Sequence, residues 1–271
     1  TLDQAISMTT KTALITGASS GIGEALAAEF AAGGFDLVLV ARSEDKLKRL
    51  ASELKAQHGV KARVEPADLS RPAAAAALAK KLKQARLPIT ALVNNAGVME
   101  HGSFADTPGS RHQQLIDLNI GGLTSMLSAF VPDMVERGEG RVLNVASIAA
   151  FQPLPSLATY AATKAYVLSL TESLSEELKG TGVTVTALCP GVTDTNMVSG
   201  AQAKSGQLNI PDFMIGEAND VARAGYKACL EGEVICVPGL LNQVSTLTTR
   251  NTPKWLLRKL MGMAGRHTLR D

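Results

Sequence analysis

Short, continuous apolar runs alternate with longer helical patterns along most of this chain, and this alternation strongly limits its possible folds. Strands that are buried on both faces give continuous apolar runs, whereas half-exposed antiparallel strands alternate apolar and polar residues. The pattern therefore predicts a parallel sheet of about seven strands. The runs are 13–15, 37–40, 91–93, 142–145, 183–188 and 234–237, with a weaker one at 62–64.

Helical patterns separate the runs, and the alanine tract 73–77 after Pro72 is the strongest helix former among them. Strands that alternate with helices form a doubly wound α/β fold, with helices on both faces of the sheet and right-handed crossovers. We expect one such domain over residues 10–250, preceded by an extension (1–9) and followed by a helix and tail (251–271). The predicted helices are about 22–32, 43–57, 71–85, 109–136, 158–179 and 217–231.

Composition excludes several functional classes. The 271 residues are 45% hydrophobic and 19% charged, which is ordinary for a globular protein. The net charge is only +2 and no basic block occurs, so we expect no nucleic-acid partner. No run of about 18 apolar residues suggests a membrane span, and the first ten residues do not resemble a signal peptide. Cys189, Cys229 and Cys236 form no C-x-x-C pair, and together these features predict a cytoplasmic protein.

A glycine-rich turn lies between the first apolar run and the first helix, where doubly wound sheets bind dinucleotides. Its glycines are spaced G-x-x-x-G-x-G rather than G-x-G-x-x-G. Glycines permit a tight turn and a close approach of a diphosphate, and a helix N-terminus supplies free N–H groups. The alternative is a turn that needs glycine for its φ angles alone. The predicted cofactor contacts here are Gly17, Ser19, Ser20, Gly21, Ile22 and Gly23.

The residues after the second run indicate which dinucleotide fits. An acidic residue at this place would bind the ribose hydroxyls of NAD and repel the 2′-phosphate of NADP. The chain has Ala41-Arg42-Ser43 instead. Because an arginine fork suits a phosphate, Arg42 favours NADP over NAD, although a solvated arginine at a helix start would look the same.

Several motifs in this order resemble the classical short-chain dehydrogenases/reductases. The likeness covers roughly residues 10–240 and implies a Rossmann-type fold with NAD(P)-dependent interconversion of an alcohol and a carbonyl. The matching elements are 16–23, Asp68-Leu69, Asn94-Asn95-Ala96-Gly97, Asn119, Ser147, Tyr160 with Lys164, and Pro190-Gly191 followed by Thr193 and Thr195.

The resemblance implies a catalytic group of Asn119, Ser147, Tyr160 and Lys164. Lys164 is one helical turn from Tyr160, so the two side chains share a helix face. Free tyrosine has a pKa near 10, and the lysine ammonium together with an oxidised nicotinamide would lower it. Ser147 would orient the substrate oxygen, while NADPH delivers hydride to carbon and Tyr160 protonates oxygen, or the reverse.

The resemblance also assigns supporting roles. Asn119 would help to place a water that links Lys164 to solvent, and Lys164 would hold the nicotinamide ribose. Asp68 would lie beside the adenine, and Asn94 would brace that region. Backbone groups near 190–195 would hold the carboxamide. The remaining predicted cofactor contacts are Leu69, Ala96, Gly97, Tyr160, Pro190, Gly191, Val192, Thr193 and Thr195.

Each of these side chains also has an ordinary structural interpretation. Ser147 could be a loop hydroxyl, and Tyr160 and Lys164 a surface i,i+4 pair. Other catalytic classes fit less well, because Ser147 lies in Asn-Val-Ala-Ser-Ile and not in a G-x-S-x-G elbow. No metal site is expected, since the histidines lack metal-ligand spacing. They are His58, His101, His112 and His267.

Two segments bear on the substrate and on partners. The stretch 196–215 mixes apolar and small residues and would cover a hydrophobic, medium-sized substrate, with Phe151, Pro153 and Leu154 as another wall. A helix at 253–265 has an apolar face opposite Lys254, Arg258 and Lys259. It would cover the site or pack on another subunit, with contact to a membrane as the less common alternative. The resemblance to the family implies a homodimer or homotetramer whose subunits contact each other through the helices 109–136 and 158–179.

These features predict an NADP-preferring oxidoreductase that acts on a small-molecule carbonyl or alcohol with a tyrosine proton donor. Within this class, the alternative is a ketoreductase of a fatty-acyl, steroid or sphingoid-like substrate. From a different class, the chain could be a non-catalytic dinucleotide-binding regulator. The intact set of Asn119, Ser147, Tyr160 and Lys164 argues against the regulator.

Overall fold

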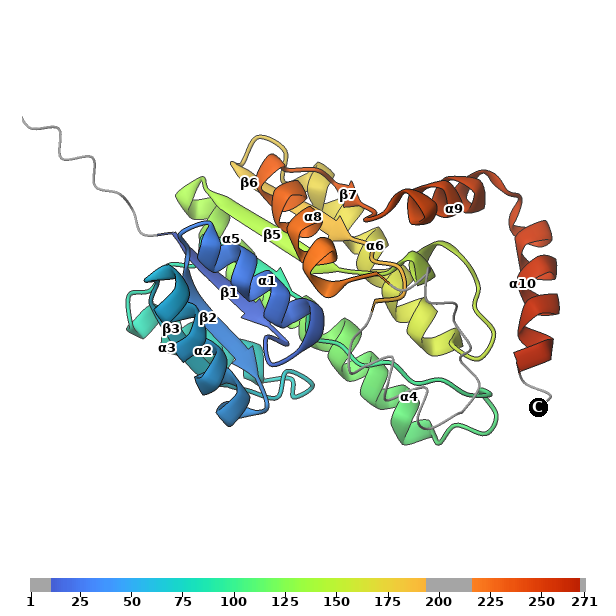
Figure 1. The fold of residues 1–271 in the computed structure, drawn as a ribbon, viewed down its shortest axis with the longest axis horizontal. Coiled ribbons are helices and arrows are strands. Elements are labelled where there is room, and N and C mark those ends of the chain that lie inside the picture. Colours follow the sequence, from blue (N-terminus) through green and yellow to red (C-terminus); the bar gives the residue numbers. More distant parts are fainter. Residues whose placement is uncertain (1–10, 194–215, 269–271) are drawn as a thin grey trace, which may run out of the picture.

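The computed structural model describes residues 11–193 and 216–268, with side chains as far as residue 263. Its centre is a seven-stranded sheet in the order β3-β2-β1-β4-β5-β6-β7, and every neighbouring pair is parallel (Figure 1). The predicted sheet is therefore confirmed. The strands are β1 (Thr12–Thr16), β2 (Asp36–Ala41), β3 (Ala62–Pro66), β4 (Ala91–Asn94), β5 (Gly140–Val145), β6 (Val183–Leu188) and β7 (Ile235–Cys236).

Helices cover both faces of the sheet, and each face has its own apolar core. α1, α2 and α8 pack on one face, where Leu26, Phe30 and Leu47 are buried. α3, α5 and α6 cover the other face, around Leu82 and Met126. These helices are α1 (Gly21–Ala32), α2 (Glu44–His58), α3 (Ala74–Gln84), α5 (Leu123–Arg137), α6 (Ala158–Glu177) and α8 (Ala218–Glu231).

Residues of β1 show why the strands are continuous apolar runs. Ala13 and Ile15 belong to the core beneath α1, whereas Leu14 between them belongs to the core beneath α3. All three are completely buried. Successive side chains of a strand point to opposite faces, so a strand covered on both faces needs apolar residues at every position.

The helix predicted at 109–136 consists of three segments: α4 (Gly109–Ile116), a π-helical turn η1 (Asp117–Gly122) and α5. Within the part of the chain that the structure describes, Gly109–Arg137 is the one helix long and apolar enough to span a membrane. Core helices of globular proteins meet the same criterion. Met126, Leu127 and Phe130 are buried against the sheet, so this helix is a core helix.

The C-terminal region differs from the sequence-based prediction. The predicted helix at 253–265 is present as α10 (Lys254–Thr268), but a further helix, α9 (Leu240–Asn251), precedes it. α9 was missed because its threonines Thr246, Thr248 and Thr249 are weak helix formers. Its apolar residues Leu240, Leu241, Val244 and Leu247 are all exposed. Elsewhere the differences are small, since α3 begins three residues later than expected and β7 is only two residues long.

Candidate active site

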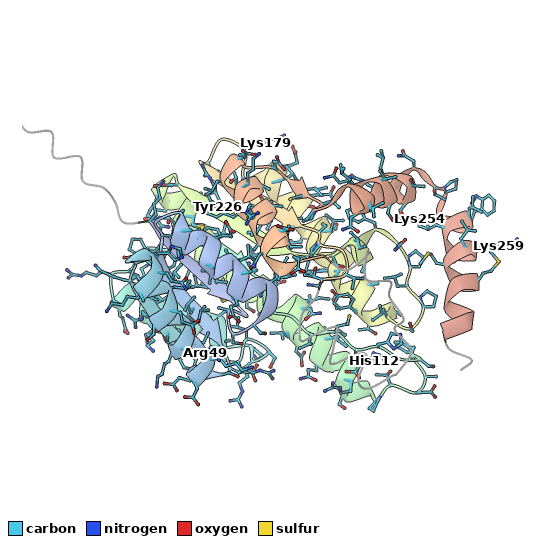
Figure 2. All side chains as sticks on the ribbon, in the orientation of Figure 1. Arg49, His112, Lys179, Tyr226, Lys254 and Lys259 are labelled. Atoms are coloured by element: carbon cyan, nitrogen blue, oxygen red, sulfur yellow. The ribbon has the colours of Figure 1, made fainter. Side chains whose placement is uncertain are left out.

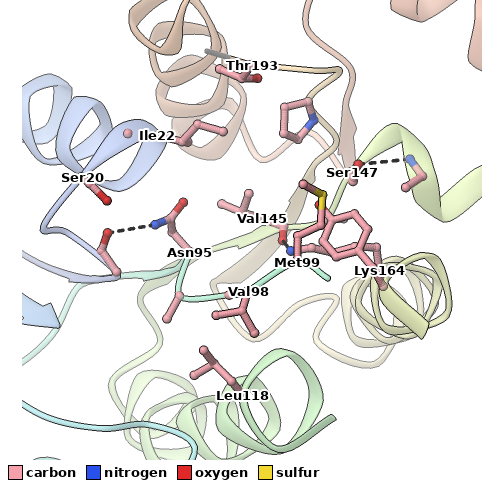
Figure 3. Close-up of a pocket in the computed structure, with 18 of the residues that line it drawn as sticks. Ser20, Ile22, Asn95, Val98, Met99, Leu118, Val145, Ser147, Lys164 and Thr193 are labelled. Carbon is pink, nitrogen blue, oxygen red and sulfur yellow. Dashed lines mark hydrogen bonds between the residues drawn. The ribbon is translucent and has the colours of Figure 1, made fainter. Parts of the chain in front are cut away.

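A cleft with a volume of about 460 Å³ opens at the carboxyl ends of the central strands (Figure 3). The strand order reverses between β1 and β4, which is where doubly wound sheets bind ligands. Most of the predicted site residues line this cleft. They are Gly17, Ser19, Ser20, Gly21, Ile22, Arg42, Asp68, Leu69, Ala96, Gly97, Ser147, Tyr160, Lys164, Pro190, Gly191, Val192 and Thr193.

Three of the predicted residues that the structure describes, Gly23, Asn94 and Asn119, are not among those that line the cleft. Thr195 lies outside the described residues, as does the predicted substrate-covering segment 196–215.

The glycine turn leaves no room for side chains. Gly17 has a φ of +65°, and a Cβ on Gly23 would lie 2.2 Å from the carbonyl oxygen of Gly17. Gly23 therefore allows α1 to pack against the turn rather than touching a ligand. The backbone at Gly17 and Gly21 is bare and lines the cleft, and this cradle allows the close approach that a diphosphate needs.

Asn95 holds this turn in place and was absent from the predicted site. Its Nδ2 donates to the carbonyl oxygens of Thr16 (3.1 Å) and Gly17 (3.3 Å). Asn94, which was expected to brace the adenine region, has a different set of contacts. Asn94 is buried in the sheet, where its Nδ2 donates to Oδ1 of Asn144 on β5. Since neighbouring residues alternate in direction at a strand end, only the second asparagine faces the turn.

The first turn of α1 points its backbone N–H groups at the cleft. Ser20 is the N-cap residue, but its side chain makes no capping hydrogen bond. The first N–H groups of a helix have no partner within the helix, and here no side chain replaces one. With the bare glycine backbone beside them, these donors suit a bound anion such as a diphosphate.

One cation, which follows β2, and one carboxylate, which follows β3, line this part of the cleft. Arg42 is exposed there. Asp68, across the cleft floor, accepts hydrogen bonds from the hydroxyl and backbone N–H of Ser70 at 2.7 and 3.2 Å. The bonds from Ser70 lower the pKa of Asp68, and the charge of Arg42 adds to this effect. Ser43, which is the N-cap of α2, also lines the cleft and makes no capping bond.

The three reactive side chains meet at the other end of the cleft. Ser147 follows β5, starts the short helix η2 (Ile148–Phe151), and accepts a hydrogen bond from the backbone N–H of Ala149 at 3.1 Å. Tyr160 and Lys164 come from α6, and Figure 3 shows the side chain of Lys164 at this end of the cleft. Lys164 Nζ donates to the carbonyl oxygen of Val145 at 2.7 Å and is only 6% exposed. The pair is therefore not a surface i,i+4 ion pair.

Burial controls the protonation of these groups. It raises the pKa of the Tyr160 phenol, against a smaller lowering by a hydrogen bond with Ser147. It lowers the pKa of Lys164 to about 8. The predicted lowering of the Tyr160 pKa by the Lys164 ammonium together with an oxidised nicotinamide stays a prediction. The ammonium of Lys164 lies 5.8 Å from the centroid of the tyrosine ring.

Asn119 lies in the π-helical turn and is almost completely buried. Its Oδ1 accepts from the Val98 backbone N–H, and its Nδ2 donates to the Val98 carbonyl, both at 2.9 Å. Nδ2 also lies 3.1 Å from the Thr163 hydroxyl on α6. The side chain thus ties the loop after β4 to the helix that carries Tyr160. The placement of a water by Asn119 stays a prediction.

The substrate end of the cleft is mostly apolar. Leu154 lines it as expected, but Phe151 and Pro153 do not. Residues that the sequence did not single out complete this wall, with Gln152 as its polar member. They are Val98, Met99, Leu118, Ile148 and Gln152. Across the described ranges, no group of three or more His, Cys, Asp or Glu residues is arranged to hold a metal.

Comparison with known proteins agrees with this geometry. The profile of the short chain dehydrogenase family matches residues 11–206. An uncharacterised oxidoreductase of Staphylococcus aureus is 38% identical over 217 residues, which are 80% of this chain and 90% of the relative. The oxidoreductase UcpA of Escherichia coli is 39% identical over 199 residues, covering 73% of this chain and 75% of UcpA.

Solved structures show the same likeness. A short-chain dehydrogenase from Sphingobium yanoikuyae in complex with NADPH has a TM-score of 0.77 and 34% identity, covering 90% of this chain and 97% of that one. A 7β-hydroxysteroid dehydrogenase has a TM-score of 0.82 and 26% identity, covering 93% and 96%. A short-chain dehydrogenase/reductase from Burkholderia phymatum in complex with NAD has a TM-score of 0.79 and 27% identity, covering 88% and 92%.

The matched region contains the glycine turn, the floor of the cleft and the Ser147, Tyr160 and Lys164 group. A nicotinamide dinucleotide is the cofactor class bound by the solved neighbours, and the cradle described above fits it. The chain therefore belongs to the short-chain dehydrogenase family, as an oxidoreductase that acts on CH–OH or C=O groups.

Proposed function

We propose that this protein is an NADP-preferring oxidoreductase that interconverts a carbonyl and an alcohol, with Tyr160 as the proton donor. One observation carries the proposal: Ser147, Tyr160 and Lys164 face the same cleft that the glycine turn and Arg42 enter from its other end. A dinucleotide that occupies the cradle would reach from Arg42 towards Tyr160.

The side chains divide the chemistry between them. When bound, the dinucleotide supplies or accepts the hydride. The hydroxyl of Ser147 donates to the substrate oxygen and fixes its angle. The phenol of Tyr160 gives its proton to that oxygen during reduction and takes it back during oxidation. Lys164 would bind the nicotinamide ribose hydroxyls with its ammonium, and the anchoring of this group on the Val145 carbonyl supports that role.

The preference for NADP rests on the end of β2. Arg42 offers a fork of donors for the 2′-phosphate, and Ser43 adds a free hydroxyl at the N-terminus of α2. The solved neighbours include complexes with NADPH and with NAD, so the family alone does not choose between them. Glu44 and Asp45 in the first turn of α2 oppose the phosphate, which limits the preference.

The substrate wall favours a hydrophobic carbonyl compound of medium size. Met99, Ile148 and Leu154 provide apolar contact, and Gln152 adds a hydrogen-bonding group near Ser147. This wall also suits the more specific alternative, a ketoreductase of a fatty-acyl, steroid or sphingoid-like substrate. The similar fold of a 7β-hydroxysteroid dehydrogenase supports that alternative.

We place the enzyme in the cytoplasm as a homodimer or homotetramer. Its cysteines are unpaired in the structure, which suits a reducing compartment. Tyr166 on α6 and Ile116 on α4 are large apolar residues exposed on the helices expected to form the contact between subunits.

A spectrophotometric screen of candidate substrates tests the function. Wild-type protein and the variant Tyr160→Phe would be incubated with a panel of ketones, aldehydes and alcohols, while the absorbance of NADPH and NADH is followed. We expect turnover of at least one apolar carbonyl by wild type, faster with NADPH, and a large loss in the variant. Dinucleotide binding without turnover of any carbonyl or alcohol would instead support the non-catalytic regulator.

A further inference from the structure

The helix α9 has its apolar side turned outward. Leu240, Leu241, Val244 and Leu247 are 79%, 68%, 64% and 65% exposed. They recur at a spacing that places them on one face of the helix. The side that faces the protein is polar instead, and Thr246 on it is only 6% exposed. A helix on a globular protein normally buries its apolar face, so this exposed face is built to contact something else.

The helix α10, which follows α9, also exposes large apolar residues. Leu257 packs inward, but Trp255, Leu260 and Met263 are 63%, 47% and 45% exposed. Lys254, Arg258 and Lys259 are exposed beside them. In Figure 2, Lys259 lies on the side of α10 away from the sheet, and α10 stands at the outer end of the molecule.

Charge is distributed very unevenly along the chain. Residues 240–271 hold six of the 27 Lys and Arg residues but only one of the 25 Asp and Glu residues, Asp271. The rest of the chain therefore has a net negative charge, although the whole chain has +2. A segment that combines exposed leucines, a tryptophan and excess cations suits a surface that is both apolar and anionic.

We propose that α9 and α10 form a docking surface for an anionic lipid bilayer. The leucine face of α9 inserts among the acyl chains near the headgroups, and Lys254, Arg258 and Lys259 bind the phosphates. Trp255 suits the headgroup level, because an indole is apolar apart from one N–H donor. A second copy of this surface fits less well, because each copy of 240–271 has six Lys or Arg residues against one Asp, and two surfaces of like charge repel each other.

The docking surface lies next to the cleft. α9 packs beside η2, the helix that follows Ser147. The side chain of Asn242 lies against Gly191, which lines the cleft. Arg250 lies over the ring of Phe151, 5.7 Å from its centroid, and 3.9 Å from Glu172 of α6. Docking through α9 would bring the substrate end of the cleft close to the lipid, from which apolar carbonyl compounds could enter.

Trp255 makes a direct test available, because it is the one tryptophan of the chain. The full-length protein would be mixed with vesicles of phosphatidylcholine, with and without phosphatidylserine. We expect co-sedimentation and a blue shift of the tryptophan emission with the anionic vesicles, and neither with the neutral ones. Raising the salt concentration should weaken the binding, since exposed charges are screened.

Two variants separate the contributions. Leu241→Ser combined with Val244→Ser removes half of the apolar face of α9, and Lys254→Glu combined with Lys259→Glu reverses two charges of α10. We expect each variant to bind anionic vesicles at least about tenfold more weakly. The matched control is Lys46→Glu with Arg49→Glu on α2, at the far side of the molecule in Figure 2, and it should bind like wild type.

Other outcomes would overturn the proposal. If wild type does not bind anionic vesicles, the surface is not a lipid-docking site. If the α9 variant instead lowers the oligomeric mass by light scattering, without any vesicle binding by wild type, the occupant is a second copy of the chain. Carbonyl reduction in vesicle-free buffer should stay unchanged in both variants, so this test fails or succeeds independently of the proposed reaction.

Discussion

Asn119 and the backbone of Val98 hold each other through two hydrogen bonds, both 2.9 Å long. The amide group of Asn119 thereby satisfies the N–H and the C=O of a residue in the loop that follows β4. A third contact, with Thr163, reaches the helix of Tyr160 and Lys164. One buried side chain thus fixes the distance between the cofactor side and the catalytic side of the cleft.

The variant Asn119→Ala should destabilise the protein and slow its reaction. It leaves the N–H and C=O of Val98 without partners in a partly buried loop, which costs about 1–3 kcal/mol. We expect a loss of this size in urea unfolding, with a fall in kcat because the loop and α6 are no longer linked. Gln113→Ala, at an exposed position of α4, should change stability by less than about 0.5 kcal/mol. An Asn119→Ala protein as stable and active as wild type would refute this role.

The variant Tyr160→Phe should bind the dinucleotide normally and lose turnover. It deletes the transferable proton and leaves the ring in place, and general acid catalysis contributes roughly 10²–10⁴-fold to a rate. Tyr166→Phe is a matched control on the same helix, because its hydroxyl contacts Thr124 and does not line the cleft. Steady-state kinetics and dinucleotide titrations measure both effects. Similar kcat values for the two variants would assign the proton to another group.

Lys164 should make folding stability depend on pH. Its pKa falls from 10.5 to about 8 on burial, so below pH 8 the folded protein carries a desolvated ammonium that the unfolded chain keeps in water. This penalty is fully present below pH 8 and disappears as the pH rises towards 10.5. Lys164→Met removes it, and the variant should be more stable than wild type at pH 7 by about 1–3 kcal/mol while losing turnover.

The difference in unfolding free energy between wild type and Lys164→Met isolates this effect from Cys229, whose pKa burial raises to about 12. That difference should shrink between pH 8 and pH 10.5. Lys179→Met, at an exposed position, should show no such change. If Lys164→Met is less stable than wild type at pH 7, the bond to Val145 outweighs the burial of the charge.

Arg42 should decide between the two dinucleotides. If its guanidinium pairs with the 2′-phosphate, Arg42→Ala weakens NADP binding by about tenfold to a hundredfold and leaves NAD binding almost unchanged. Ala41→Asp should shift the preference in the same direction by repelling the phosphate. Titrations of both dinucleotides at fixed salt measure the ratio, with Arg49→Ala on α2 as the control. Equal weakening of both dinucleotides would show that Arg42 does not bind the phosphate.

The positions of most cleft residues followed from the sequence because their roles are local. Gly17 and Gly21 both have positive φ angles, which glycine adopts most easily. The glycines of the sequence therefore mark the position of this turn. Tyr160 and Lys164 share a helix face through their spacing alone. The role of Asn95 in holding the glycine turn was not visible in the sequence. It depends on where β4 ends relative to β1, which is set by contacts between segments nearly 80 residues apart.

The amino-acid sequence by itself determined the order of strands and helices, since burial on both faces of a sheet requires continuous apolar runs and helices require a 3.6-residue period. Tertiary structure alone decided which polar groups find hydrogen-bond partners, which pKa values shift and which apolar residues are exposed to solvent. Lys164 becomes a weaker base because the sheet and α6 remove its water, and the pattern Tyr-x-x-x-Lys carries no information on that burial. The outward leucines of α9 were likewise invisible, because exposure depends on what the rest of the chain covers.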